Sequence, residues 1–93
     1  MATFMTRIEL HDATYDDYET LHSAMEAEGF TRTITSDDGV AYYLPTAEYY
    51  RDAQLTRQQV LDSAKRAAGK TRKSYSAVVT ESKGVTWTGL AKV

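Results

Sequence analysis

The sequence predicts an α+β domain in which two helices pack on one face of an antiparallel sheet. Three observations support this fold class. Extended runs alternate with two helical runs within 93 residues, both helical runs carry start and stop signals, and an Asp-Gly pair joins two extended runs in the manner of a β-hairpin. A chain of this length forms one hydrophobic core, so residues 1–93 are expected to be a single domain.

The first strand and the first helix follow from the spacing of apolar residues. Side chains that favour burial recur at every second position over residues 4–10, the period of a strand with one buried face. A threonine N-cap and two aspartates then begin a helix over residues 14–28. Gly29 ends this helix, and Phe30 is expected to pack back on Met25, one turn inside.

The middle of the chain predicts two or three strands. Residues 30–35 are rich in Thr and Ile and are typical of a strand, and residues 36–39 (Ser-Asp-Asp-Gly) form a hairpin turn. Residues 40–44 should then pair back on the second strand. Pro45 lacks an amide donor and interrupts regular pairing, after which residues 47–53 resume an extended conformation.

The second helix has the clearest local signals in the chain. Thr56 and Gln59 have the spacing of a capping box, while Leu55 and Val60 flank them as a hydrophobic staple. The apolar stripe that follows is mostly alanine, which allows close contact with a sheet, and Gly69 ends the helix.

Two extended runs close the chain. Residues 74–80 alternate as a strand, and residues 85–90 are expected to form a short final strand. The simplest topology for this order, with right-handed crossovers, is a ferredoxin-like βαββαβ sandwich. One sheet face carries both helices, and the other face is expected to be open.

The formal net charge of −2 conceals an uneven distribution along the chain. Residues 1–54 contain eleven acidic and three basic residues, whereas residues 55–93 contain two acidic and eight basic residues. The basic cluster that could attract a polyanion consists of Lys65, Arg66, Lys70, Arg72 and Lys73. Alternatively, these cations complement a helix C-terminus and a solvated loop.

Several classes of protein are excluded by composition. The chain has no cysteine, so it has no disulfide and no thiolate nucleophile or zinc ligand. No apolar run approaches the roughly 20 residues that span a bilayer, and the N-terminus lacks a signal-peptide pattern. We therefore expect a cytoplasmic protein with no membrane contact of its own.

Candidate chemistry centres on three residues near the first strand and first helix. His11 and His22 are the only imidazoles, and each is a candidate proton carrier near neutral pH. Asp12 closes the first strand, where a carboxylate can reach Mg²⁺. The alternatives are a core-edge role for His22 and capping or loop roles for the aspartates. The histidines are not at metal-ligand spacing, so no metal site is assigned and Mg²⁺ is left as an option through Asp12 alone.

Aromatic side chains form a second candidate surface. Tyr42, Tyr43, Tyr49 and Tyr50 lie in extended segments, and those that face away from the helices could stack on unpaired bases near Arg32 or Arg51. Cross-strand packing or a dimer surface would explain the same residues.

The run over residues 18–30 (Tyr-Glu-Thr-Leu-His-Ser-Ala-Met-Glu-Ala-Glu-Gly-Phe) resembles the GhoS antitoxin family of type V toxin–antitoxin systems. The Asp-Asp-Gly hairpin, the Leu44-Pro45 break and the Leu55-Thr56 helix start extend the resemblance over nearly the whole chain. The resemblance implies a ferredoxin-like endoribonuclease that cuts the messenger RNA of a membrane-damaging toxin, similar in fold to the small CRISPR-adaptation nucleases.

The resemblance also implies site residues. The best-known family member has an arginine in the first helix where this chain has His22, which changes the chemistry available at that position. The CRISPR-type relatives place an aspartate at the end of the first strand, where Asp12 is the nearest equivalent. We therefore expect His22, Asp12 and His11 as catalytic candidates. RNA contacts are expected from Arg32, Arg51 and the basic cluster.

Two other functions agree with the same sequence. A binding or adaptor module for RNA or protein could keep the fold without catalysis, because fold alone does not carry function. A homodimer formed through an edge strand, with residues 85–90 and Trp87 as the candidate edge, would have a purely structural role.

Overall fold

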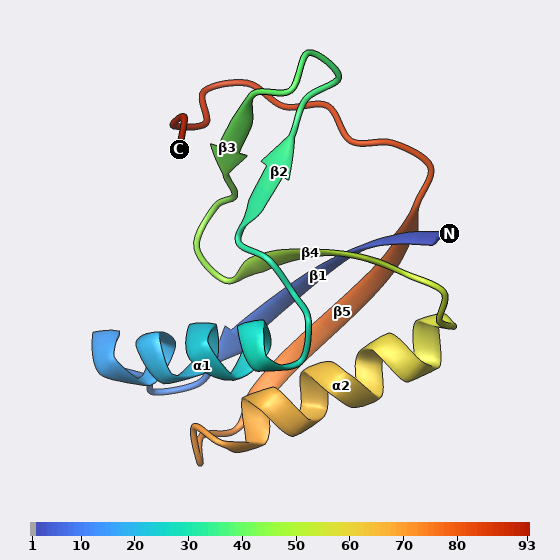
Figure 1. The fold of residues 1–93 in the computed structure, drawn as a ribbon. Coiled ribbons are helices and arrows are strands. Elements are labelled where there is room, and N and C mark those ends of the chain that lie inside the picture. Colours follow the sequence, from blue (N-terminus) through green and yellow to red (C-terminus); the bar gives the residue numbers. More distant parts are fainter. Residues whose placement is uncertain (1) are drawn as a thin grey trace.

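The computed structural model describes residues 2–93, and its main sheet is built around the first strand. Strand β1 (Ala2–Leu10) lies between β4 (Glu48–Ala53) and β5 (Tyr75–Ser82), and both pairings are antiparallel. Figure 1 shows the two flanking strands on either side of β1. The strand from the start of the chain is therefore central, and it joins segments that are far apart in sequence.

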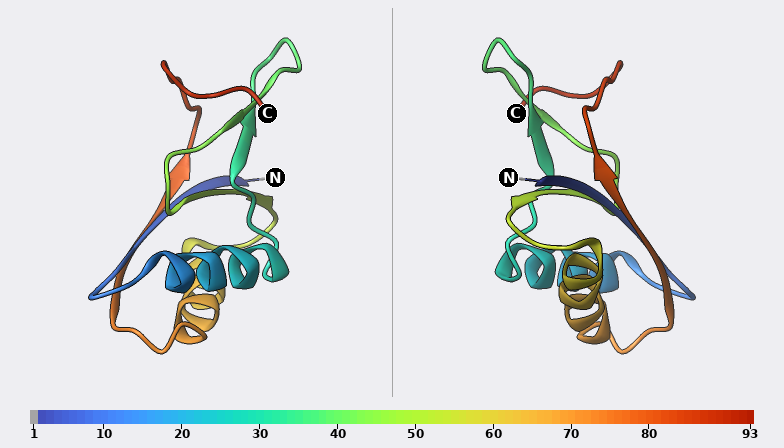
Figure 2. Two further views of the ribbon diagram at one scale, coloured as in Figure 1. Left: turned by 90° about the vertical axis from the view of Figure 1, so that its left-hand side faces the viewer. Right: turned by 90° about the vertical axis from the view of Figure 1, so that its right-hand side faces the viewer.

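Both helices cover the same face of this sheet, as predicted (Figure 2). Helix α1 spans Tyr15–Ala27 and helix α2 spans Arg57–Gly69. Each begins with a complete capping box, whose N-cap is Thr14 in α1 and Thr56 in α2. The predicted boundaries of both helices agree with the structure within one residue.

The end of α1 has the geometry that the sequence predicted. Gly29 has φ of +97°. The amide of Phe30 donates to the carbonyl of Met25 at 3.0 Å, and the amide of Gly29 donates to Glu26 at 3.0 Å. These two bonds form a Schellman motif, which satisfies carbonyls that the helix would otherwise leave free.

The core lies between the sheet and the two helices. Alternate residues of β1 point into it, and α2 contributes alanines that leave no exposed surface, so the helix can pack closely on the strands. Its members are Phe4, Ile8, Leu10, Leu21, Ala24, Met25, Phe30, Tyr49, Val60, Ala64, Ala67 and Ala68.

The predicted second strand is divided between two pairings. Thr31 forms an isolated bridge with Tyr50 of β4, and β2 (Thr33–Thr35) then leaves the main sheet to pair with β3 (Ala41–Tyr43). After β3, the turn at Pro45, whose carbonyl accepts the amide of Glu48 at 3.1 Å, redirects the chain into β4. The β2–β3 hairpin consequently projects from the sheet (Figure 1).

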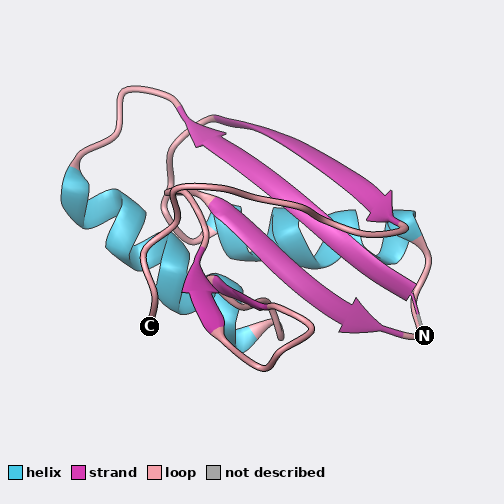
Figure 3. Ribbon diagram, turned by 90° about the horizontal axis from the view of Figure 1, so that it is seen from above, coloured by secondary structure: helices cyan, strands magenta, loops and turns pink. Residues whose placement is uncertain are grey.

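The structure differs from the sequence prediction at the C-terminal end. Residues 85–90 do not form a strand. Gly89, with φ of +76°, interrupts the extended path, and the backbone pairs only further on, where Lys92 bridges Tyr42. In Figure 3 the segment after β5 runs back across the sheet, on the face without helices, towards the hairpin.

These features confirm an α+β fold with a mostly antiparallel sheet and helices on one face, consistent with the ferredoxin-like arrangement. The face of the β4-β1-β5 sheet away from the helices is here termed the open face. Within residues 2–93, no helix is long and apolar enough to cross a membrane.

Candidate nucleic-acid interface

Two loops meet at the C-terminal end of β1. The amide of His11 donates to the carbonyl of Ser74 at 2.9 Å and so joins the β1–α1 loop to the loop between α2 and β5. Asp12 and Arg72 have φ of +52° and +61°, so each loop contains one non-glycine residue in the left-handed region. Such conformations cost roughly 1–2 kcal/mol for a residue with a Cβ and cluster at functional sites.

The imidazole of His11 lies among hydroxyl groups on the solvent-exposed edge of this end. Its Nδ1 atom is 3.2 Å from Oγ of Ser74, and its Nε2 atom is 3.2 Å from Oγ of Ser76. The carboxylate of Glu9 is 3.7 Å from the same Nε2 atom. The ring is therefore oriented by neighbours on two strands and remains accessible to a large substrate.

The structure brings only part of the basic cluster to this end. Lys70, Arg72 and Lys73 lie after α2, in the loop whose Ser74 bonds to His11. Lys73 makes an ion pair with Asp17 at 3.7 Å, in the first turn of α1. We refer to His11, Asp12 and residues 70–74 together as the basic end.

Lys65 and Arg66 lie earlier on α2 and do not join the basic end. Arg66 donates to the carboxylate of Glu28 and to the hydroxyl of Ser63, at 3.1 and 3.0 Å. This guanidinium thus links the two helices. The charge run in the sequence consequently contains an interhelical contact as well as a loop exposed to solvent.

Asp12, which belongs to the basic end, is exposed and is not part of a cluster that could hold a metal. Among the residues described, no three His, Asp or Glu side chains converge on one position. A Mg²⁺ ion here would need further ligands from RNA phosphates, which is common for this ion.

His22 lies in the core, separate from the basic end. Its side chain is 6% exposed, and its Nδ1 atom is 2.6 Å from the hydroxyl of Tyr49, which is fully buried. Burial, and after it the positive charge of Arg32, lowers the pKa of His22. Burial also raises the pKa of Tyr49 well above its ordinary value, so the phenol stays protonated and its O–H donates a hydrogen bond to Nδ1 of His22.

The two remaining arginine candidates lie near the hairpin rather than the basic end. The guanidinium of Arg51 stacks over the ring of Phe30 at 5.3 Å, and its buried Nη1 atom has no hydrogen-bond partner. The carbonyl of Arg32 accepts the amide of Leu44 at 2.8 Å, where the hairpin begins. The structure thus divides the predicted RNA-binding residues between two regions.

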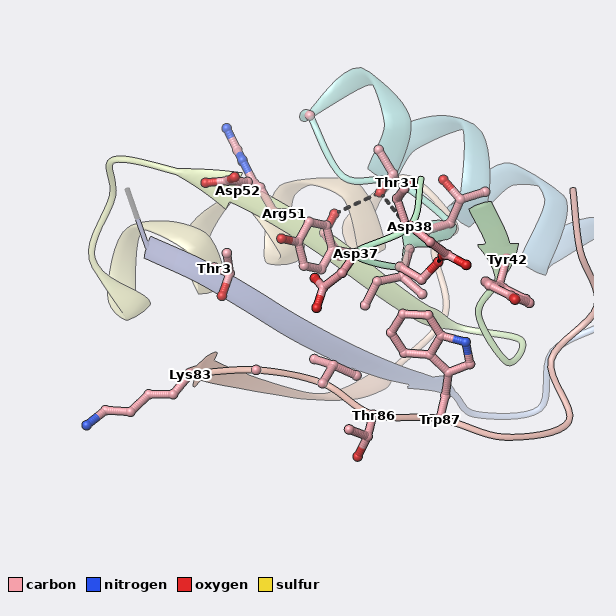
Figure 4. A pocket seen from close by; sticks show the side chains of 18 residues that line it. Thr3, Thr31, Asp37, Asp38, Tyr42, Arg51, Asp52, Lys83, Thr86 and Trp87 are labelled. Carbon is pink, nitrogen blue, oxygen red and sulfur yellow. Dashed lines mark hydrogen bonds between the residues drawn. The ribbon is translucent and has the colours of Figure 1, made fainter. Parts of the chain in front are cut away.

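A groove of about 1050 Å³ lies at the opposite end of β1. Its walls are the open face near Thr3, the β2–β3 hairpin, and the segment from Lys83 to Trp87 (Figure 4). Tyr42 and Trp87 meet edge to face in it, with ring centroids 5.6 Å apart. Of the tyrosines considered as stacking platforms, Tyr42 and Tyr50 line the groove, whereas Tyr49 is buried beneath the helices.

Sequence reasoning did not find the partners of the two histidines. Ser74 and Ser76 follow His11 by 63 and 65 residues, and Tyr49 follows His22 by 27. The alternation of residues 74–80 predicts that Ser74 and Ser76 lie on the same face of their strand. Only the register between β1 and β5 places them beside His11. Compared with known proteins, the chain matches no protein-family model, and no curated protein matches it significantly.

Proposed function

We propose that this protein is a cytoplasmic, antitoxin-like endoribonuclease that binds and cleaves a toxin messenger RNA at the basic end. The observation that carries the proposal is the meeting of the exposed His11 with the loop that contains Lys70, Arg72 and Lys73. A cationic loop attracts the RNA backbone, and an accessible imidazole is a suitable proton acceptor. The resemblance to the GhoS family supplies the type of substrate.

The reaction that these groups support needs no protein nucleophile. The neutral imidazole of His11 removes the proton of a ribose 2′-hydroxyl, and the 2′-oxygen attacks the adjacent phosphorus. The bond from phosphorus to the 5′-oxygen breaks, and the departing oxygen takes a proton from water. The products are a 2′,3′-cyclic phosphate and a 5′-hydroxyl end. Arg72 and Lys70 would stabilise charge on the phosphate.

His22 is not assigned a catalytic step in this proposal. Its ring is enclosed between α1 and β4, so a phosphodiester would reach it only after the helix moved. The direct role for His22 stays a prediction that the same experiment tests.

Labelled mixed-sequence RNA, incubated with purified protein in Mg²⁺ and separately in EDTA, tests the proposal. His11→Gln should lower cleavage by roughly 10²-fold or more, the usual contribution of a general base. The matched control is His22→Gln, which should retain cleavage. Cyclic phosphate ends formed in EDTA would support the metal-free route.

Other outcomes separate the alternatives. RNA that is bound in a salt-dependent manner but never cut, with several candidate transcripts, would indicate a binding module. Loss of cleavage in folded His22→Gln with normal cleavage in His11→Gln would move the chemistry to α1 and contradict the proposal.

A further inference from the structure

The groove presents a free strand edge. β2 pairs with β3 alone in its two-stranded sheet. The amide of Leu44 bonds to the carbonyl of Arg32 and that of Ser36 to the carbonyl of Val40, so the even-numbered positions that flank β2 make hairpin bonds. In an antiparallel pair the intervening residues direct their backbone groups away from the partner. The amides of Thr33 and Thr35 therefore point to the unpaired side of β2.

This free edge borders the groove. Thr33, Ile34, Thr35 and Ser36 all line it, one after another. If one face of β2 lined the groove, only every second residue would line it, because successive side chains point to opposite faces of a sheet. Consecutive lining residues indicate that the groove runs along the edge, where a backbone can be recognised.

The opposite wall leaves room for another strand. It consists of residues 83–87, which form no regular structure, and includes the ring of Trp87. A volume of about 1050 Å³ is at the large end of the range for ligand sites, and an extended segment of a few residues can enter such a groove from its open side.

Charge selects the type of occupant. Asp37, Asp38 and Asp52 line the groove. In Figure 4, the side chain of Lys83 extends away from it, and the charged end of Arg51 points away from Trp87. The hydroxyl of Ser36 donates to Asp38, which lowers the pKa of this carboxyl group and keeps it ionised.

We propose that this groove binds an extended, positively charged polypeptide segment, which adds as a strand to the free edge of β2. Its backbone would bond to Thr33 and Thr35, and its cationic side chains would face the three carboxylates. The carboxylates disfavour RNA in the groove. A second copy of the chain would bring its own Asp37 and Asp38 there and is disfavoured for the same reason. This site is independent of the proposed nuclease at the basic end.

The test uses a synthetic peptide of about seven residues in which Lys and Val alternate, the length of an ordinary strand. Trp87 is the only tryptophan in the chain and reports binding by its fluorescence. The expected result is saturable binding that weakens with salt, with shifted amide resonances at Thr33 and Thr35. Control peptides have Glu in place of Lys, or N-methyl groups on alternate amides, and both should bind at least about tenfold more weakly.

Matched variants test the strand edge in the protein. Thr35→Pro removes an amide that faces the groove and leaves the hairpin bonds in place, so it should weaken peptide binding about tenfold. Thr35→Val keeps the amide and should bind as the wild type does. Asp37→Asn combined with Asp52→Asn should weaken binding about threefold at low salt.

Three results would overturn the proposal. The first is absent peptide binding, or equal binding of the N-methylated and unmodified peptides. The second is an oligouridylate that changes Trp87 fluorescence and competes with the peptide, which would assign the groove to RNA. The third is a dimer in solution that Thr35→Pro disrupts, which would assign the edge to a second copy. Unchanged RNA cleavage by Thr35→Pro would separate this site from the nuclease.

Discussion

The two ends of β1 share one strand and one core but present different chemistry. At its start, near Thr3, the surface is concave, lined by aspartates and aromatic rings, and bordered by an unpaired strand edge. At its finish, the surface carries an exposed imidazole held by serines and a loop with three cations. The strand itself sets neither chemistry. Each end is determined by the segments that the sheet register places beside it.

The comparison also indicates where each end is vulnerable. Side chains of β1 that point to the helices are buried along most of its length, so the core is common to both ends. The loops and the hairpin differ, and each depends on local turns. Changes in the core should therefore affect both ends equally, whereas changes in turns and caps should affect one end more.

The largest effect is expected for Phe30→Ala. The ring of Phe30 is 2% exposed and contacts Tyr49 and the guanidinium of Arg51. Its removal should lower the free energy of unfolding by about 3–5 kcal/mol, because it leaves a cavity in the shared core. Urea denaturation measures this, with Tyr15→Ala as control, since Tyr15 is 77% exposed. Equal losses in both variants would contradict a common core.

A smaller effect is expected for Gly29→Ala, at the groove end. The residue has φ of +97°, and an added Cβ would lie 3.2 Å from the guanidinium carbon of Arg51. The loss should be about 1–2 kcal/mol. Gly69→Ala is the matched control, because it is helical and has open space around it, and should gain about 0.5 kcal/mol. The same sign in both variants would show that backbone conformation does not decide the effect.

The two capping boxes give one probe at each end. Thr14 lies beside the basic end, and Thr56 follows the finish of β4, near the start of β1. Replacing either by Ala should cost about 1 kcal/mol in thermal or urea denaturation. Backbone hydrogen exchange should increase mainly near the altered cap, and the two losses should add in the double variant. Hydrogen exchange that rises equally at both ends would contradict the view that each cap stabilises only its own end of the molecule.

The smallest effect concerns pH. The folded state lowers the pKa of His22. As the pH falls below about 6.5, the imidazole therefore binds a proton more readily in the unfolded chain than in the folded one, and the free energy of unfolding decreases. Glu19 and Glu26 oppose this shift, so the change should be modest. The urea midpoint of the wild type should decrease between neutral and mildly acidic pH more than that of His22→Gln. Parallel profiles in the two proteins would contradict this origin.

Most of the fold could be predicted because its signals are local. The N-cap Thr14, the capping box at Thr56, Gly29 and the Asp-Gly turn each act within a few residues, and all appear in the structure. The division of residues 30–35 between two sheets could not be predicted, because it depends on where β4 ends its pairing. The sequence also predicts a final strand over residues 85–90, which the structure does not form; Gly89, within this segment, has φ of +76°.

The sites were less accessible to prediction, for the same physical reason. His11 and His22 look alike in sequence, yet one is exposed and the other buried, because only the fold decides which face of a strand or helix is covered. The basic run looked continuous, but the turn at residues 70–74 directs only part of it towards His11. The groove has no sequence motif, since its walls come from three distant segments.

The central position of β1 also affects how the chain acquires its structure during synthesis. Residues 2–10 are made before both of their partners, and residues 75–82 follow only after β4 and α2. At a synthesis rate of about 5–20 residues per second, β1 waits seconds for this partner while β4 is already available. The β1–β4 pair with α1 would then form first, and β5 would close the sheet only after α2 had been completed. Closure of this long loop is the step expected to limit the rate of folding.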